Sequence, residues 1–288
     1  MRAVRIHGWG QAPVLETLPD PVPTPGRSIV RMAAATVGHI DRTVAAGKFM
    51  SPLRPPYIPG VEGAGIVVGG DRFAAGQRVW VRGGGLGNRS DGTWCELIDA
   101  PDGAVGELPD GIPFELGSAF FSPCASAWVA VHGVGALRAG ERVAVTGASG
   151  AVGTVAAQLA CEAGATLVES PGPGATVDLL IDTVGGTVLE ALLPAVEPGG
   201  RVVLVGYTAG ESLSVSLPWL LQRDVRLPPL NMYRREAEGR AALPELLARL
   251  ADGRITVATR SFPIGEAAEA LAWIGQRGHR GLAVLVPD

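Results

Sequence analysis

The chain has 288 residues, of which 47% are hydrophobic, and its formal net charge is -4 at pH 7. This length suffices for two domains with ordinary cores, and the slightly acidic charge offers no basic surface for nucleic acid. The N-terminus has no apolar signal core, and the uncharged residues 143–161 form a glycine-rich turn and a helix rather than a membrane span. We therefore expect a cytoplasmic protein that binds neither nucleic acid nor membranes.

The first 110 residues contain short apolar runs separated by glycine and proline, a pattern typical of a small β-rich domain. From about Leu116 the sequence becomes alanine-rich and then alternates strands with helices, which indicates a parallel sheet. The predicted strands are 143–146, 166–169, 177–183 and 201–206, with helices at 154–163 and 188–195. The tail is predicted to contain helices at 241–251 and 265–278 and a strand at 283–286.

The three cysteines are Cys95, Cys124 and Cys161. They lie far apart in the sequence and form no CxxC pair, so neither a disulfide framework nor a structural zinc site is indicated. We expect buried thiols.

The most informative segment is the turn TGASGAVG at residues 146–153, between the apolar run 142–145 and the alanine-rich helix. A strand that leads through such a turn into a helix presents free backbone N–H groups and the positive helix end to a phosphate. Glu169 follows at about the spacing of a ribose-binding carboxylate. The pattern predicts a Rossmann-type unit. Its candidate cofactor-binding residues are Gly147, Ser149, Gly150, Ala151, Val152, Gly153 and Glu169.

Together with several other segments, this turn resembles the medium-chain dehydrogenase/reductase superfamily. Within it, the chain is similar to the zinc-independent quinone oxidoreductase-like and enoyl reductase-like branch, and the resemblance runs nearly end to end. It rests on PxxPGVEGAGIV (56–67), AGxRVW (75–80), GxWCE (92–96), AGERVAVTGASGAVG (139–153), DTVGG (182–186) and PGGRVVLVG (198–206).

The resemblance implies an α/β fold with two parts. A GroES-like β-rich substrate domain would comprise residues 1–117 and 255–288, and a truncated Rossmann-type parallel-sheet domain would comprise residues 118–254. The substrate cleft is expected at their junction. Relatives commonly dimerise by pairing strands, but Pro228 and Pro229 fall in that region and proline cannot donate to a strand ladder. A homodimer is therefore possible, but the surface through which two chains would pair is left open.

The residues at the zinc-binding positions of relatives argue against a metal. Zinc-dependent relatives carry Cys-Gly-x-x-Asp and Gly-His-Glu, because a catalytic zinc needs three protein ligands and an open position. The corresponding segments here are GHID at 38–41 and GVE at 60–62, so both soft ligands are missing. His39 has no partner at a metal-binding spacing. We predict a zinc-independent protein with no metal site.

The second Rossmann strand is followed by a much shorter segment than in relatives. There, a third strand and flanking helices wall the adenine and ribose, whereas here only PGPGATV (171–177) intervenes. An extended link of about seven residues spans roughly 25 Å, so the sheet can close although the adenosine pocket cannot form as in relatives. No Lys or Arg lies between Arg142 and Arg201, and a 2′-phosphate usually needs a cation. We expect NAD(P)H, with NADH favoured over NADPH and Glu169 on the ribose, or no dinucleotide at all; Glu169 is equally well interpreted as a solvated strand end.

The resemblance also suggests the residues around the reacting atoms. The cleft segment is 38–49, and the candidate catalytic residues are His39, Thr43, Tyr57 and Tyr207, with Tyr233 as another phenol near the cleft. Only His39 titrates near neutrality unaided, although a hydrogen-bonded loop histidine is the simpler interpretation. Asp41 is predicted to cap a helix at 42–46. Further cofactor contacts implied by the resemblance are Ser126 beside the nicotinamide, Val184, Gly206, Tyr207 and Asn231.

Three functions remain open. The first is a zinc-free NAD(P)H-dependent oxidoreductase that reduces an activated C=C bond or a quinone of a small hydrophobic metabolite. The second is a cofactor-independent, reductase-like enzyme of secondary metabolism that performs cyclisation, dehydration or isomerisation. The third is a binding protein without chemistry.

Overall fold

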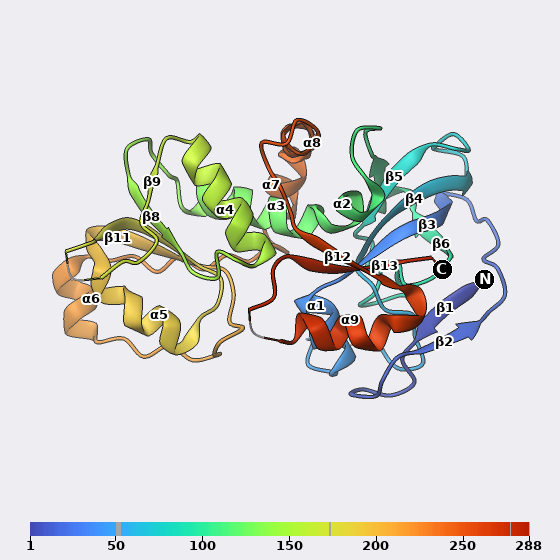
Figure 1. Cartoon of the computed structure of the whole chain (residues 1–288), viewed down its shortest axis with the longest axis horizontal. Helices are drawn as coiled ribbons and strands as arrows, with labels where there is room; N and C mark the ends of the chain where they lie inside the picture. The colour runs from blue at the N-terminus through green and yellow to red at the C-terminus, as the bar shows by residue number, and fades with distance from the viewer. Residues whose placement is uncertain (50–52, 173, 277, 288) are drawn as a thin grey trace. The chain divides into compact units, whose positions relative to one another are not determined.

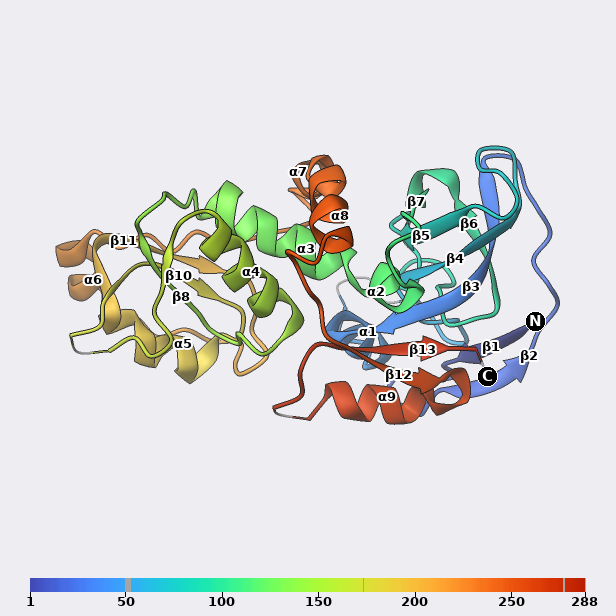
Figure 2. The same ribbon diagram turned by 45° about the horizontal axis from the view of Figure 1, so that its top comes forward.

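The structure is a computed structural model that describes residues 1–49, 53–172, 174–276 and 278–287. The chain divides into two compact units, Met1–Phe121 with Val257–Asp288 and Ser122–Thr256. Both ends of the chain belong to the first unit, as Figures 1 and 2 show. In the part of the chain that the structure describes, no helix is long and apolar enough to cross a membrane.

The first unit is built on a largely antiparallel sheet with the order β12-β13-β3-β4-β5-β7, to which β6 adds by pairing with β3. Its strands are β3 (Arg27–Val37), β4 (Glu62–Gly69), β5 (Arg78–Arg82), β6 (Leu97–Pro101), β7 (Val105–Glu107), β12 (Thr259–Pro263) and β13 (Leu282–Val286). β13 pairs antiparallel with β3, with Ala283 opposite Val37. This pairing joins the C-terminal segment to the N-terminal domain, as the resemblance implied.

Smaller elements cover this sheet. They are the antiparallel pair β1 (Arg2–Arg5) and β2 (Val14–Thr17), and the helices α1 (His39–Ala45), α2 (Phe114–Ala119) and α9 (Ala267–Ile274), with one-turn 3-10 helices at Asp102–Ala104 and Ile264–Glu266. Trp94 is fully buried, and its indole N–H donates to the carbonyl of Thr36 at 2.9 Å. The apolar ring and the satisfied polar atom together fix the loop before β6 to the sheet.

The second unit is built on a parallel sheet with the order β11-β10-β8-β9. Its strands are β8 (Arg142–Val145), β9 (Thr166–Leu167), β10 (Val177–Asp182) and β11 (Val196–Leu204). Helix α4 (Ala151–Glu162) connects β8 to β9, and α5 (Gly186–Leu192) connects β10 to β11. Figure 1 shows these two helices on opposite faces of the sheet. The predicted fold class, a GroES-like domain with a truncated Rossmann-type parallel sheet, is confirmed.

This unit contains further helices. They are α3 (Phe121–Trp128), which continues as a π-helix over Val129–Val134, the 3-10 helix Leu193–Ala195, α6 (Leu217–Arg223), α7 (Glu236–Ala241) and α8 (Leu243–Ala251). Of these, α6 packs on β11, while α7 packs on α8 and on the π-helix. The predicted helix 241–251 is thus the second of two helices that meet at Ala242, because Pro244 is favoured in a first helical turn and cannot continue a preceding one. The predicted helix 265–278 ends at Ile274, and the predicted strand 166–169 is only two residues long.

Residues 226–230 lie along the outer edge of β11. Val202 N–H donates to the carbonyl of Arg226 at 2.8 Å, Leu204 N–H to that of Pro228 at 3.0 Å, and Leu230 N–H to that of Leu204 at 2.8 Å. The segment therefore lies parallel to the edge of β11 but is joined to it only by two isolated bridges, at Arg226 and Pro229, as expected where proline cannot donate to a strand ladder.

Candidate functional site

The glycine-rich turn between β8 and α4 is narrow because two of its glycines leave no room for a side chain. Gly147 has a φ of +62°, and a Cβ added there would lie 2.9 Å from Cγ1 of Val184. A Cβ added to Gly153 would lie 2.7 Å from the carbonyl carbon of Gly147. Only glycine allows the first turn of α4 to pack so closely on the preceding loop.

The same turn presents unused backbone donors. Gly150 N–H closes the loop on the carbonyl of Gly147 at 2.8 Å, and Thr154 N–H makes the first bond of the helix, to Gly150 at 2.9 Å. The N–H groups of Ala151, Val152 and Gly153 have no acceptor among the described residues, and the N-cap, Gly150, has no side chain to supply one. The first turn of α4 contains no acidic residue. Three free amides at the positive end of a twelve-residue helix suit a phosphate group.

A buried network locks this turn to the end of β10. Thr146 Oγ1 donates to Asp182 Oδ1 at 2.6 Å, and Asp182 Oδ2 accepts from Gly185 N–H at 2.9 Å. Thr183 N–H in turn donates to Thr146 Oγ1 at 2.9 Å. Asp182 is fully buried, and this burial raises the pKa of its carboxyl. Asp182 and Thr146 were missed as site residues, although the DTVGG motif that begins at Asp182 was the available signal.

Several predicted cofactor contacts gather at this edge of the sheet. Val184 packs against Gly147, and its carbonyl accepts from Ala209 N–H at 2.7 Å. Gly206 N–H donates to the carbonyl of Asp182 at 3.2 Å, which places Gly206 and Tyr207 after the neighbouring strand end. Tyr207 is 63% exposed. Val184 therefore contacts the turn itself, whereas Gly206 and Tyr207 lie beside residues 183–185.

Other predicted contacts are placed elsewhere in this unit. Glu169 is exposed beyond the edge strand β9, Ser126 is half-buried on α3, and Ser149 is exposed at the tip of the turn. The side chain of Asn231 accepts from Arg234 N–H at 3.2 Å and so closes a local turn. The contacts that the structure describes for these four residues do not bear on their predicted roles in cofactor binding.

The predicted catalytic residues of the first unit lie on or under α1. His39 begins this helix, and its ring lies 5.8 Å from the ring of His279. Desolvation lowers the pKa of His39, and the nearby His279 and Arg42 lower it further. Thr43 Oγ1 donates to the carbonyl of His39 at 3.0 Å. His279 was missed, because it lies near the opposite end of the sequence from His39.

Tyr57 occupies a different environment. It is 1% exposed and packs with Ile6, Val44 and Ala45 beneath α1. Burial raises the pKa of its hydroxyl to about 12, and the nearby Asp41 contributes to this rise. In this structure Tyr57 is a core residue whose hydroxyl does not reach solvent, which counts against its predicted role as a proton donor.

Asp41 corrects a prediction about α1. The helix begins at His39 with Gly38 as N-cap, so Asp41 is not the N-cap of a helix at 42–46 but lies within the first turn. Its buried carboxylate accepts from Gly38 N–H at 2.8 Å and from Val61 N–H at 3.2 Å. Burial raises the pKa of Asp41 to about 7, with a further rise from Glu62, which itself pairs with Arg82 at 2.8 Å. Among the described residues no group of three or more His, Cys, Asp or Glu side chains could hold a metal ion.

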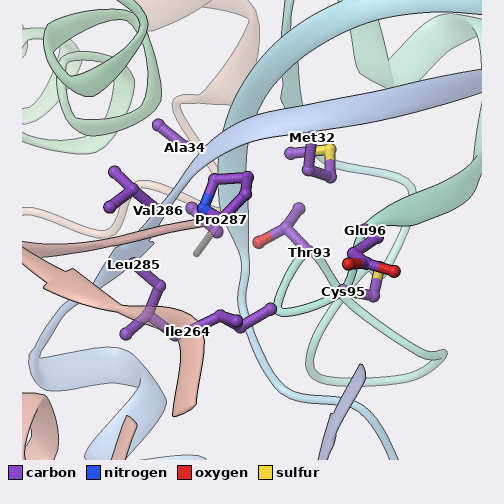
Figure 3. A pocket seen from close by; sticks show the side chains of 10 residues that line it. Met32, Ala34, Thr93, Cys95, Glu96, Ile264, Leu285, Val286 and Pro287 are labelled. Atoms are coloured by element: carbon purple, nitrogen blue, oxygen red, sulfur yellow. The ribbon is translucent and has the colours of Figure 1, made fainter. Parts of the chain in front are cut away.

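The first unit also encloses a small cavity of about 10 Å³ beside Cys95 (Figure 3). Met32, Thr93, Ile264 and Leu285 contribute to its lining. This volume holds at most one water molecule, so the cavity is no substrate site. Cys95 and Cys124 are buried as predicted, but Cys161 is exposed on α4, where the expectation of a buried thiol is wrong.

The chain matches two family models. One, described as alcohol dehydrogenase GroES-like domain, matches residues 24–110, and the other, described as zinc-binding dehydrogenase, matches residues 156–285.

Two curated relatives are quinone oxidoreductases. The quinone oxidoreductase of Lama guanicoe is 28% identical over 245 residues, which cover 72% of this chain and 73% of the relative. The probable quinone oxidoreductase of Schizosaccharomyces pombe is 26% identical over 323 aligned residues, which cover 98% of this chain and 96% of the relative. The second alignment is longer than this chain, because the relative has residues that this chain lacks.

A solved structure shares the fold. The quinone oxidoreductase from Thermus thermophilus, solved also in complex with NADPH, is 26% identical, with a TM-score of 0.80, and the match covers 99% of this chain and 100% of that chain.

Proposed function

The chain belongs to the medium-chain dehydrogenase/reductase superfamily, and on this premise we propose that it is a zinc-free oxidoreductase of the quinone oxidoreductase-like kind. Its reaction is the reduction of an activated C=C bond or a quinone in a small hydrophobic substrate, with a reduced nicotinamide nucleotide as the reductant. The observation that carries the proposal is the turn at residues 146–153, with its free amides and its two sterically required glycines.

The residues at the turn fit the phosphate part of this cofactor. Ala151, Val152 and Gly153 offer N–H donors, and the close approach of Gly153 to Gly147 leaves the loop open to a ligand. When bound, the nicotinamide supplies the hydride. The chain itself contributes the binding amides and the Thr146 to Asp182 network, which holds the turn in place.

The proton for the reduction comes from water or from His39. The pKa of His39 is lowered, so the imidazole is largely neutral at neutral pH. Its proton-donating form is populated only under acidic conditions, which favours water as the proton source near neutrality.

Two features support a zinc-free site and a preference for NADH. In the segments where the resemblance expects zinc ligands, Gly38 and Val61 offer no side-chain ligand atom, and their backbone N–H groups donate to Asp41. The guanidinium of Arg142 is occupied by Asp178 and Glu197 at 3.0 and 3.3 Å, so it is not free to bind a 2′-phosphate.

One observation favours a second function. The described residues between β9 and β10 form neither helix nor strand, so the wall of an adenosine pocket is missing there. A cofactor-independent enzyme that performs cyclisation, dehydration or isomerisation of a hydrophobic metabolite is the alternative.

The test is titration of the full chain with NADH and NADPH, followed by mixing with an enone or a quinone. We expect NADH to bind more tightly than NADPH and to be consumed when the acceptor is added. A low-micromolar NADPH dissociation constant would overturn the NADH preference. Failure of both nucleotides to bind at millimolar concentration would favour the cofactor-independent function.

A further inference from the structure

We infer that this chain recognises only the nicotinamide mononucleotide half of its cofactor, and that the adenosine half adds no binding energy. The inference rests on the proposed function and names the part of the cofactor that the same site takes. It follows from an asymmetry between the two halves of the second unit.

A complete dinucleotide-binding sheet consists of two βαβαβ halves, each of which holds one mononucleotide. The half that begins at β10 keeps all its elements in order, namely β10, α5, β11, α6 and the extended segment 226–230, which bridges to the edge of β11. The half that begins at β8 contains only β8, α4 and β9. This incomplete half is the one that carries the glycine-rich turn and, in complete sheets, the adenosine.

The chain after β9 does not replace the missing strand. β9 pairs only over Thr166 and Leu167, and one further bond joins Val168 N–H to the carbonyl of Val143 at 2.8 Å. The following link bonds to itself, since Gly172 and Ala175 exchange hydrogen bonds of 3.1 and 3.0 Å. Of the described residues in this link, none lies in a helix or an extended strand.

The surface beside β9 is an open groove where further elements would otherwise pack. It is lined by Ala157, Gln158, Cys161, Glu162, Leu167 and Arg254. The face of α4 that carries Cys161 is therefore exposed to solvent. β9 is the edge strand of this sheet, so an adenine bound beyond β9 would have no neighbouring strand to cover its outer face and would gain little apolar burial.

The phosphate site itself does not depend on the missing strand. The turn is fixed from the other side by Thr146 and Asp182, which bridge β8 to β10, and by the contact of Gly147 with Val184. The three free amides at the start of α4 are therefore positioned by contacts with the half of the sheet that begins at β10. A single phosphate with a nicotinamide riboside fits what remains.

The experiment is calorimetric titration of the full chain with NADH, reduced nicotinamide mononucleotide, AMP and inorganic phosphate. We expect the dissociation constants of NADH and the reduced mononucleotide to agree within about threefold, which is less than about 1 kcal/mol. AMP is expected to compete no better than inorganic phosphate. NADH binding at least about tenfold tighter than the mononucleotide, equivalent to about 1.4 kcal/mol, overturns the inference and leaves the proposed function standing. Failure of both reduced nucleotides to bind overturns the proposed function as well.

A matched pair of variants shows whether the turn is the site. Gly150 accepts a side chain with a small shift of its neighbour, since an added Cβ would have one tight contact, with the carbonyl oxygen of Gly147 at 3.2 Å. We expect Gly150→Asp to lose binding of both reduced nucleotides, because its carboxylate repels the phosphate, while Gly150→Asn, of equal size, retains most of it. Equal losses in the two variants would contradict phosphate binding at this turn.

Discussion

The hydroxyl of Thr146 donates a 2.6 Å hydrogen bond to Oδ1 of Asp182, and both residues are buried. This bond joins the ends of two adjacent parallel strands, and its partners also bind the backbone of Thr183 and Gly185. The glycine-rich turn after β8 is therefore positioned by the segment after β10, which is why its geometry survives the loss of a neighbouring strand on the other side.

Removing the side-chain hydroxyl of Thr146 should destabilise the second unit. We expect Thr146→Val to lower the free energy of unfolding by about 1–3 kcal/mol, because Asp182 and Thr183 N–H both lose a partner in a buried place. Thr187→Val, on the exposed surface of α5, is the control and should change it by less than about 0.5 kcal/mol. Guanidinium titration measures both. Equal effects in the two variants would show that the network contributes no stability.

The parallel sheet and the turn could be predicted from the sequence because both depend on local patterns. Apolar runs alternate with helices, and the glycines at 147 and 153 mark the turn between β8 and α4. The shortened link was also visible as a gap in an otherwise familiar order. In each case the signal lies within one stretch of chain, and the structure agrees with it.

The side-chain relationships could not be predicted in the same way. Thr146 and Asp182 lie 36 residues apart, and their contact depends on which strands are neighbours. Tyr57 carries the same hydroxyl whether it lines a cleft or fills a core, and only its burial against Ile6 and Val44 decides between them. The pairing of His39 with His279 requires the C-terminal segment to return to the first unit.

The glycine at position 153 should be essential for the turn. A Cβ there collides with the carbonyl group of Gly147 and lies 3.0 Å from Cα of Ala148, so the start of α4 must shift. We expect Gly153→Ala to lose about 1–3 kcal/mol of stability and to weaken NADH binding at least about tenfold. Gly150→Ala is the matched control, because its Cβ has a single contact at 3.2 Å. Calorimetric titration and thermal unfolding of both variants test this, and a Gly153→Ala protein with unchanged binding would refute the close packing.

Asp41 should make stability depend on pH in an unusual direction. Its pKa is raised from 3.8 to about 7, so between these values the folded chain binds more protons than the unfolded chain. Stability from this group therefore falls as pH rises from about 4 to about 7, by about 1.4 kcal/mol for each unit of the pKa shift. Subtracting the Asp41→Asn profile from the wild-type profile isolates this slope.

Asp178 provides the control of opposite sign. Its hydrogen bond to Arg142 holds the pKa of its carboxyl below the usual value, so its contribution to stability is lost as pH falls. Denaturant unfolding of wild type, Asp41→Asn and Asp178→Asn from about pH 2.5 to 8 should show the Asp41 contribution falling as pH rises from about 4 to about 7, and the Asp178 contribution being lost as pH falls below about 4. Slopes of the same sign would show that Asp41 is ionised normally.

The pKa of His39 should respond to its histidine neighbour. Desolvation is the main cause of its lowered pKa, and the charge of His279 adds to it. We expect His279→Gln to raise the pKa of His39 toward 6.5 without reaching it, as measured by NMR titration of the imidazole signals. His132, whose pKa is also lowered but whose neighbours are Glu245 and Arg249, is the internal control and should not move. A shift of both histidines would indicate a global change in structure instead.

The extended segment 226–230 at the edge of β11 should resist pairing with a second copy of the chain. Arg226 and Leu230 point their N–H groups at β11, so Leu227 and Pro229 face outward, and Pro229 has no N–H to offer. Leu227 N–H has no acceptor among the described residues.

We expect fast amide exchange at Leu227 and slow exchange at Leu230. Light scattering should show that any wild-type dimer is unaffected by Pro229→Asp, and that Pro229→Val, which restores an outward donor, raises the dimer fraction. Protection of Leu227 in a wild-type dimer that Pro229→Asp dissociates would mean that the chain pairs through this edge after all.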